Sequence, residues 1–498
     1  MEESHACCCA EKNIVKPGRG TPFLRHTVFQ TIADWCDVGP ITIDMVPDLA
    51  LIEIFDFYMA EGVNNAASQC CREAWIILAH VCRKWRDIVF GSPSRLNVRL
   101  LFKAQRSVKA MLDTWPPLPI GIWGSDLRVR DVDNIIAALE HTDRIYKIEL
   151  CDPSLFRLEQ AFAAMQKPFP SLKELAVIFV DEWERLAVPD SFLSGSAPLL
   201  RSLWLRSIQI PLPLLRNLLL SATDLVELHI LKIPNSGLIS PEAIVACLSG
   251  LNRLEKFELG FRSLRNWRSQ GLPPSTRCVL PTLTLLRFDG SCEYLEDLIA
   301  PIDSPLLDNL DVTVFRQPGL ATPQLAQFVD RTPKLKALHE ARIVFGDSAS
   351  VSFSRTRPRG LDFSITCLPS DQLSVMTQLC TSSFLRTLIP MIKHLYILDS
   401  GTQNLFRIAG SRWKDVLSPF TTVEDLYLSR KLSPHIVPAL QGIIEEGAME
   451  VLPSLLNLFL QRGFPPDLGF GVAGAAVIRF VAALHLSSRP IVVSNWDT

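Results

Sequence analysis

Two short stretches of this chain have residue types and spacing that could carry chemistry. The first, Gly469-Phe470-Gly471-Val472-Ala473-Gly474, has the glycine spacing of a loop that binds the phosphates of a dinucleotide. Such a loop must directly follow a strand and open a βαβ unit with an acidic residue beyond it. Here Pro465-Pro466 separates the glycines from the strand expected at 455–460, and only 24 residues follow Gly474. We therefore reject a dinucleotide site.

The second stretch is Cys7-Cys8-Cys9, which lies close to His5 and consists of residue types that bind zinc. Adjacent cysteines point apart, and no second pair of ligands follows at the spacing of a zinc finger. Nine histidines are scattered without a carboxylate pattern, and no Gly-x-Ser-x-Gly, His-Glu-x-x-His or Walker-type motif occurs. The sequence therefore predicts a protein that is not an enzyme and holds no metal or cofactor. An enzyme with a site in irregular loops is kept as a third hypothesis.

Composition narrows the class of protein. The chain has 498 residues, of which 48% are hydrophobic and 20% charged, as in folded proteins, and it is too long for one compact core. Its net charge of −2 argues against a partner that binds through overall charge, such as a nucleic acid. A basic run over 83–109 carries no recognised nucleic-acid-binding motif, so we interpret it as a solvated helical face.

Cysteine usage indicates the compartment. The 13 cysteines form no Cys-x-x-Cys pair, and the chain has no Asn-x-Ser/Thr acceptor. Both features favour a reducing intracellular compartment, the cytoplasm or the nucleus. The longest candidate for a membrane span, 471–486, is about a turn too short and contains Arg479 and His485, so we expect no membrane partner.

Two helices are expected near the start of the chain. The first opens at Pro47, whose missing N–H costs nothing in the first turn of a helix, and its apolar residues recur at helical spacing. The second is expected over 73–90, with an apolar stripe that includes Val81 and Trp85. Residues 57–72 lose this period and are expected to form the loop between the two helices.

From about residue 140 the chain repeats a unit of the form apolar-x-x-apolar-x-apolar. Its copies begin at Ile145, Leu172, Leu200, Leu225, Leu254, Leu283, Leu307, Leu335, Ile392, Val423 and Leu455, with a weak copy around Leu361 and Phe363. Successive copies are about 24 to 32 residues apart, within or near the period of leucine-rich repeats. The last two apolar residues of each copy are expected to point inward from a short strand, and the rest of the unit returns on the outside as a helix. Such units stack into a parallel solenoid.

Several of the return helices carry a start signal, a Ser or Thr directly before a proline. The signals are Ser240-Pro241, Thr322-Pro323 and Ser433-Pro434, and the return helices are expected over 213–220, 241–248, 323–329 and 434–444. A helix over 472–486 and a short strand over 491–493 are expected to close the end of the array.

The predicted fold class is α/β, with a small all-helical module, an irregular leucine-rich-repeat solenoid with concave parallel strands and convex helices, and a C-terminal helical cap. The predicted parts are a flexible leader over 1–40, the helical module over 41–110, a linker or first cap over 111–140, the solenoid over 141–470 and the cap over 471–498.

If this solenoid binds a partner, the contacts should come from strand residues that alternate onto the concave face. By the period of two, these candidates are Trp204, Arg206, His229, Glu258, Arg287, Asp289, Asp311, His339, Tyr396, Tyr427 and Phe459. Their mixture of charges and aromatic rings suits the surface of a protein better than one small ligand.

The opening module resembles the F-box family. The matching residues are Val46-Pro47, Asp48, Leu51, Ile54 and Phe55, followed by Val81-Cys82-Arg83-Lys84-Trp85-Arg86-Asp87-Ile88. The sequence departs from the family pattern at Leu49 and Ala50, and in a longer segment between the two halves. Together with the repeats and the closing tail over 489–496, the chain resembles the large, divergent F-box proteins common in mushroom-forming fungi.

This resemblance implies a substrate-recognition adaptor of a Skp–cullin–F-box ubiquitin ligase. The F-box would dock on a Skp-type adaptor, and through it on a cullin, while the repeats would bind a target protein of unknown identity. The residues implied in docking are Val46, Pro47, Leu51, Ile54, Phe55, Val81 and Trp85. So small a module cannot bury all of these side chains by itself, and an apolar face left over after folding is a surface for a partner.

The alternative is a scaffold solenoid unrelated to ubiquitin. In that interpretation residues 41–90 are only the N-terminal helical cap of the repeats, and Trp85 is an aromatic residue of the core.

Overall fold

The computed structural model describes residues 43–498 apart from 65–73, 94–95, 97, 104–106, 126–128, 153, 182–184, 235–236, 264–276, 316–319, 337, 347, 357–358, 401–412, 446–450, 462–471, 487–488 and 498. The leader expected over 1–40, with its cysteine run, and the glycine stretch as far as Gly471 lie outside the described residues. The chain divides into two compact units, Met1–Val98, here called the N-terminal unit, and Arg99–Thr498, here called the repeat array.

The described part of the N-terminal unit is helical. Its elements are η1 (Ile43–Met45), α2 (Asp48–Asn64), α3 (Ala74–Val81) and α4 (Arg83–Gly91). Helix α2 begins directly after Pro47, as predicted. It continues to Asn64, so residues 57–64, which were predicted to start a loop, are helical. The helix formers Met59, Ala60 and Glu61 favour that continuation.

The second predicted helix is broken in two at Cys82. The backbone of Cys82 is extended, with φ −158° and ψ 174°, and its Sγ accepts a hydrogen bond from the Trp85 N–H at 3.5 Å. Cys82 therefore caps α4 instead of continuing α3. Helix α4 packs against α2 through the rings of Trp85 and Phe55, whose centroids lie 4.7 Å apart.

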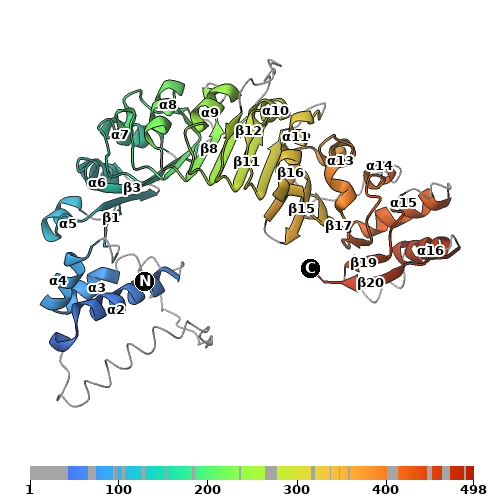
Figure 1. Ribbon diagram of the computed structural model, residues 1–498, viewed down its shortest axis with the longest axis horizontal. Coiled ribbons are helices and arrows are strands. Elements are labelled where there is room, and N and C mark those ends of the chain that lie inside the picture. Colours follow the sequence, from blue (N-terminus) through green and yellow to red (C-terminus); the bar gives the residue numbers. More distant parts are fainter. Residues whose placement is uncertain are drawn as a thin grey trace, which may run out of the picture. The chain divides into compact units, whose positions relative to one another are not determined.

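One sheet of sixteen described strands runs through the repeat array (Figure 1). In spatial order these strands are β1 (Leu100–Lys103), β2 (Ile120–Ser125), β3 (Ile145–Asp152), β4 (Glu174–Phe179), β6 (Ser202–Arg206), β8 (Glu227–Ile233), β9 (Lys256–Phe261), β11 (Leu285–Gly290), β13 (Asn309–Val314), β16 (Arg359–Ile365), β15 (Ala349–Thr356), β14 (Glu340–Phe345), β17 (His394–Asp399), β18 (Asp425–Leu428), β19 (Asn457–Gln461) and β20 (Val492–Trp496). Two short ladders flank it, β5 (Leu186–Ala187) with β7 (Ile208–Gln209) and β10 (Cys278–Val279) with β12 (Ile302–Asp303).

Helices connect successive strands of the array. They are α5 (Val108–Thr114), α6 (Val129–Leu139), α7 (Leu155–Ala164), α8 (Leu212–Ser221), α9 (Pro241–Leu248), α10 (Cys292–Ile299), α11 (Pro323–Arg331), α12 (Gln372–Cys380), α13 (Leu385–Leu388), α14 (Trp413–Leu417), α15 (Ser433–Glu445) and α16 (Val472–Leu486). In Figure 1 the labelled helices of the array lie along one face of the sheet. The other face, here called the open face, carries no helix from the described part of the array.

The repeat pattern explains this layering. Apart from Leu460, all the apolar repeat anchors predicted from the sequence are buried, because they point from the strands toward the helices. The predicted return helices agree closely with α8, α9, α11 and α15, and the predicted closing helix agrees with α16. A mixed α/β array with a long, mainly parallel sheet is therefore the observed architecture.

The sheet begins earlier than the sequence predicted. Strands β1 and β2 pair in parallel, and β2 pairs with β3, so the supposed linker over 111–140 consists of α5, β2 and α6. These strands lack the leucine pattern of later copies. At Gly121 in β2, a Cβ would lie 2.9 Å from the Leu101 side chain and 3.0 Å from the Tyr146 hydroxyl, so the close packing at this position favours glycine. The boundary of 41–110 for the helical module is also corrected, since the compact units divide after Val98.

The parallel order is interrupted once in the described sheet. After β13 the chain passes through α11 and η5 (Pro333–Lys336) and forms β14 three strand positions away, and β15 and β16 then fill the two positions between them. Strand β15 pairs antiparallel with both neighbours, so the expectation of a uniformly parallel solenoid was wrong here. Gly360 allows β16 to pair closely with β15, because a Cβ at this position would collide with the Phe353 carbonyl oxygen.

The predicted helix caps differ in their outcome. The Ser240 hydroxyl accepts a hydrogen bond from the Ala243 N–H at 3.3 Å, as predicted for α9. Thr322 makes no such bond at the start of α11. Instead the carboxylate of Glu296, in α10, accepts hydrogen bonds from the N–H groups of Gln324 at 2.6 Å and Leu325 at 2.9 Å. The return helix α11 is thus capped by a side chain of the neighbouring helix α10, and no local sequence motif predicts this contact.

Glu296 should make the stability of the array depend on pH. Burial raises its pKa to about 7 from an ordinary value of 4.5, although the two backbone N–H groups oppose the shift. The folded state then holds this proton more tightly than the unfolded state. The stabilisation is complete below pH 4.5 and is lost as the pH rises through 7, by up to about 3 kcal/mol.

We expect hydrogen exchange at the amides of Gln324 and Leu325 to show lower protection at about pH 8 than at about pH 5, after correction for intrinsic exchange rates. The Glu296→Gln variant, which cannot ionise, should lose this dependence. An equal dependence in the variant and the parent would show that another group is responsible.

Candidate functional site

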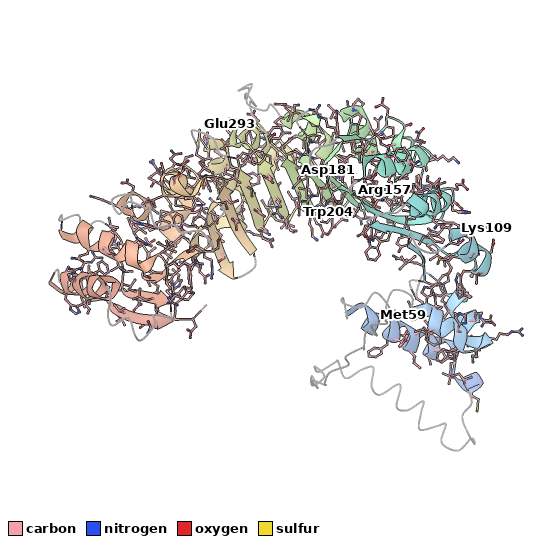
Figure 2. All side chains as sticks on the ribbon, turned by 180° about the vertical axis from the view of Figure 1, so that it is seen from behind. Met59, Lys109, Arg157, Asp181, Trp204 and Glu293 are labelled. Carbon is pink, nitrogen blue, oxygen red and sulfur yellow. The ribbon has the colours of Figure 1, made fainter. Side chains whose placement is uncertain are left out.

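The open face presents one continuous row of side chains, here called the central row. Strand register connects its members, one from each strand of the sheet from β2 to β20: Trp123, Glu149, Ala176, Trp204, His229, Glu258, Arg287, Asp311, Asp362, Ser352, Arg342, Tyr396, Tyr427, Phe459 and Ser494. Because they alternate with the buried anchors, these side chains face away from the helices. Figure 2 shows this for Trp204.

Most of the residues predicted for the concave face lie in this row. They are Trp204, His229, Glu258, Arg287, Asp311, Tyr396, Tyr427 and Phe459. Arg206 and Asp289 lie two residues further along their strands, on the same side of the sheet. His339 precedes β14, where the predicted register was wrong, and Arg342 takes the place in the row.

His229 differs from the others because it is buried, with only 5% of its surface exposed. Its ring stacks on Trp204 with centroids 4.8 Å apart, and its Nδ1 lies 3.3 Å from Glu258 Oε1. The His229 ring holds the pKa of Glu258 below its ordinary value, against the opposing effect of burial. His229 therefore positions its neighbours in the row, and it is not itself an exposed contact.

Four carboxylates gather around Arg287 in the middle of the sheet. This acidic zone consists of Glu258, Asp289, Asp311 and Asp362, from β9, β11, β13 and β16. The Arg287 Nε lies 3.2 Å from Asp311 Oδ2. Partial desolvation raises the pKa values of Asp289 and Asp311 although Arg287 opposes the change. Desolvation and the neighbouring Asp311 together raise the pKa of Asp362 to about 6.

An aromatic stack lies further along the same row. The rings of Tyr396 and Tyr427 have centroids 4.2 Å apart, and those of Tyr427 and Phe459 are 4.4 Å apart, with nearly parallel planes in both pairs. The Arg342 guanidinium covers the other side of Tyr396 at 4.4 Å. Trp496 meets Tyr427 edge-on at 5.7 Å and donates a hydrogen bond to the Leu428 carbonyl oxygen at 3.3 Å.

Three residues of the acidic zone and the aromatic stack were not predicted from the sequence. Asp362 could have been found, because it alternates with Leu361 and Phe363 of the weak repeat copy. Arg342 was missed because the strand begins after the leucines that were used to set its register. Trp496 has no sequence signal, since only the parallel pairing of β19 with β20 brings it to the stack.

The predicted docking residues of the N-terminal unit fall into two groups, one buried and one at the surface. Leu51 and Phe55 are buried in the unit's own core, with 1% and 0% of their surfaces exposed, so their expected availability to a partner was wrong. Trp85 is half-buried against Phe55. Helical packing explains this, because Leu51 and Phe55 are four residues apart and lie on the side of α2 that faces α3 and α4.

The remaining docking residues lie at the surface of the N-terminal unit. Ile54 and Val81 are each 55% exposed, Pro47 is exposed, and Val46 is half-buried. The Val46 carbonyl oxygen accepts a hydrogen bond from Lys84 Nζ at 2.8 Å, which ties the start of α2 to α4. Asp48, Ile52, Arg83, Lys84, Asp87, Ile88, Gly91 and Ser92 line a shallow hollow of about 550 Å³ there.

Further exposed apolar side chains accompany Ile54 and Val81. Phe57 and Tyr58 follow Ile54 at spacings of three and four residues, which places them on one side of α2. Ile77 stands four residues before Val81 on α3, and Leu49 is exposed near the start of α2. The N-terminal unit thus exposes six large apolar side chains on α2 and α3, Leu49, Ile54, Phe57, Tyr58, Ile77 and Val81, which are together called the apolar helix surface here.

Within the described residues, no group of three or more His, Cys, Asp and Glu side chains is arranged to hold a metal ion. A helix long and apolar enough to cross a membrane is likewise not found in the part of the chain that the structure describes.

Comparison with known proteins identifies no family for this chain. No family model matches the chain, and no curated protein matches it. Among solved structures, it is similar to the leucine-rich repeat-containing protein LegL7 from Legionella pneumophila, with a TM-score of 0.28 and 10% sequence identity, covering 76% of this chain and 97% of that chain. The assignment of a mixed α/β repeat array therefore rests on the strands, helices and buried anchors described above, which are consistent with a leucine-rich-repeat-like solenoid.

Proposed function

We propose that this protein is a non-catalytic adaptor that recruits a target protein to a Skp–cullin–F-box type ubiquitin ligase. The N-terminal unit docks on the Skp-type adaptor, and the open face of the repeat array binds the target. The observation that carries the first half is the apolar helix surface, where six large apolar side chains of a small helical unit are exposed together with the Pro47-led helix that resembles the F-box.

Physical chemistry supports a partner for this surface. Large exposed apolar patches on soluble proteins mark interaction sites, and burial of one such side chain contributes about 1.5–3 kcal/mol. Burying Ile54 and Val81 in a partner groove would therefore account for a large part of a stable docking interaction. Leu51 and Phe55 are buried in the core of the unit. They contribute to docking only indirectly, by holding the helices that carry the exposed side chains in place.

The open face supports the second half of the proposal. It offers charged zones and stacked aromatic rings over many strands, which suits a polypeptide better than a small ligand. Aromatic residues and arginine are enriched at the centres of protein interfaces.

Docking can be tested on the full-length protein with the Skp-type adaptor of the same organism. We expect Ile54→Asp combined with Val81→Asp to weaken adaptor binding at least about 100-fold, measured by isothermal titration calorimetry, because two apolar contacts are lost and two charges would be buried. Far-UV circular dichroism should stay unchanged, since both side chains are exposed.

Phe156→Asp is the matched control. Phe156 is an equally exposed apolar residue, at 66%, but it lies on α7 of the repeat array. If the double variant binds as well as the parent, Ile54 and Val81 are excluded as docking residues. If the parent protein binds no Skp-type adaptor, the ligase adaptor itself is excluded. The scaffold solenoid with an N-terminal helical cap then becomes the better interpretation.

A further inference from the structure

We propose that the open face from β9 to β19 binds an extended segment of the target that carries a lysine or arginine about six to eight residues from an aromatic or aliphatic side chain. The inference rests on the proposed function only in taking the bound molecule to be a protein. Three features of the open face support it: the charge of the acidic zone, the surface of the aromatic stack and the distance between the two.

The acidic zone is complementary to a cation. Its four carboxylates surround one guanidinium, that of Arg287, which already pairs with Asp311. The Asp362 side chain is exposed, and its carboxylate makes no hydrogen bond or salt bridge with another residue of the described chain. The zone therefore has an excess of negative charge on the open face. A lysine or arginine of a partner would offset it, whereas a nucleic acid or an acidic segment would be repelled.

The aromatic stack is complementary to an apolar side chain. Each ring is stacked on its neighbour, and Arg342 covers the end of the stack beside β14. The half-buried edges of the Tyr396, Tyr427 and Phe459 rings therefore form the exposed surface. Ser494, the neighbour of Phe459 in register, is too small to cover the outer face of that ring. Tyrosine rims offer both apolar area and hydroxyl groups that can hydrogen-bond a partner's backbone.

Strand spacing sets the distance between the two zones. From the midpoint of β13 and β16 to that of β17 and β18 there are four strand spacings, or about 19 Å at about 4.8 Å each. Phe459, on β19, lies about 26 Å from the first midpoint by the same measure. An extended chain advances about 3.3 Å per residue, so the two anchors of a bound segment would be about six to eight residues apart. Only Ser352 and Arg342 occupy the central row between the zones.

The test is a selection of random peptides, displayed on phage and long enough to reach both zones, on the immobilised full-length protein. Enriched sequences should contain a lysine or arginine six to eight residues from an aromatic or aliphatic residue. Their affinity, measured with synthetic peptides by fluorescence anisotropy, should fall at least about tenfold for Asp311→Asn combined with Asp362→Asn, and by a similar factor for Tyr427→Ala.

Glu149→Gln is the control on the open face. Glu149 lies in the same central row, but on β3, and its substitution should leave peptide affinity unchanged. Enrichment of acidic peptides, of peptides without the spacing, or of none at all would overturn the inference, as would equal affinities in the parent and the acidic-zone variant. Because these substitutions lie outside the N-terminal unit, binding of the Skp-type adaptor should be unaffected by them. Failure of this inference is therefore distinguishable from failure of the docking proposal.

Discussion

Replacing Phe55 by alanine is expected to unfold the N-terminal unit while the repeat array stays intact. Phe55 is completely buried and its ring contacts Trp85 at 4.7 Å. Truncating a buried phenylalanine typically costs about 3–5 kcal/mol, through lost burial and the cavity left behind. A unit this small has little stability to spare, since whole domains are stable by only about 5–15 kcal/mol.

Hydrogen exchange followed by mass spectrometry separates the two units. In Phe55→Ala the amides of α2 and α4 should lose most of their protection, while those of β6 to β11 should keep theirs. Ile54→Ala is the matched control, because it removes a neighbouring but exposed side chain and should change stability by less than about 0.5 kcal/mol. Unchanged protection of α2 in Phe55→Ala would contradict the core position. Any loss of adaptor binding by Phe55→Ala must accordingly be interpreted as unfolding.

Replacing Tyr294 by alanine is expected to destabilise the middle of the array by about 4 kcal/mol or more. Tyr294 reaches from α10 to the sheet side of the core, where its ring lies 4.7 Å from that of Phe261 and 5.9 Å from that of Phe288. Its hydroxyl donates a hydrogen bond to the Ile239 carbonyl oxygen at 2.6 Å. Burial raises the pKa of Tyr294, which keeps the hydroxyl protonated as a donor. Alanine would leave both a cavity and a buried carbonyl group without its partner.

Tyr294→Phe separates these two effects. It keeps the ring and removes only the hydrogen bond, so we expect a loss of about 1 kcal/mol. Chemical denaturation should rank the parent first, then Tyr294→Phe, then Tyr294→Ala, and exchange should accelerate in β9 and β11 of the alanine variant. Equal losses in the two variants would show that the hydrogen bond, rather than the ring packing, holds this region together.

The layered architecture could be predicted because it depends on local periodicity. Leucines such as Leu203 and Leu205 recur at a fixed spacing and must all be buried on one side of a strand, which leaves little choice about which face meets the helices. Strands β1 and β2 escaped prediction because their close packing relies on Gly121, a residue that normally argues against a strand. The crossing from β13 to β14 was equally hidden, since strand order depends on pairing between distant residues.

Much of the candidate site followed from the same alternation, and the failures have physical causes. The period of two places His229 on the open side, but it cannot show that Trp204 and Glu258 cover the ring. In the N-terminal unit, an apolar stripe shows that α2 packs against something. It does not show whether the partner is α4, as for Phe55, or the exterior, as for Ile54.

The antiparallel insertion of β14, β15 and β16 has a consequence for how the array assembles. In a uniform solenoid each repeat adds to the one before it, and growth can pass from neighbour to neighbour along the chain. Here β13 and β17 are not neighbours in the sheet. An antiparallel meander of β14, β15 and β16, which are consecutive in sequence, lies between them and pairs with both. Such hairpins close over short loops and form with little entropic cost. The meander can thus act as a seed from which repeats grow in both directions.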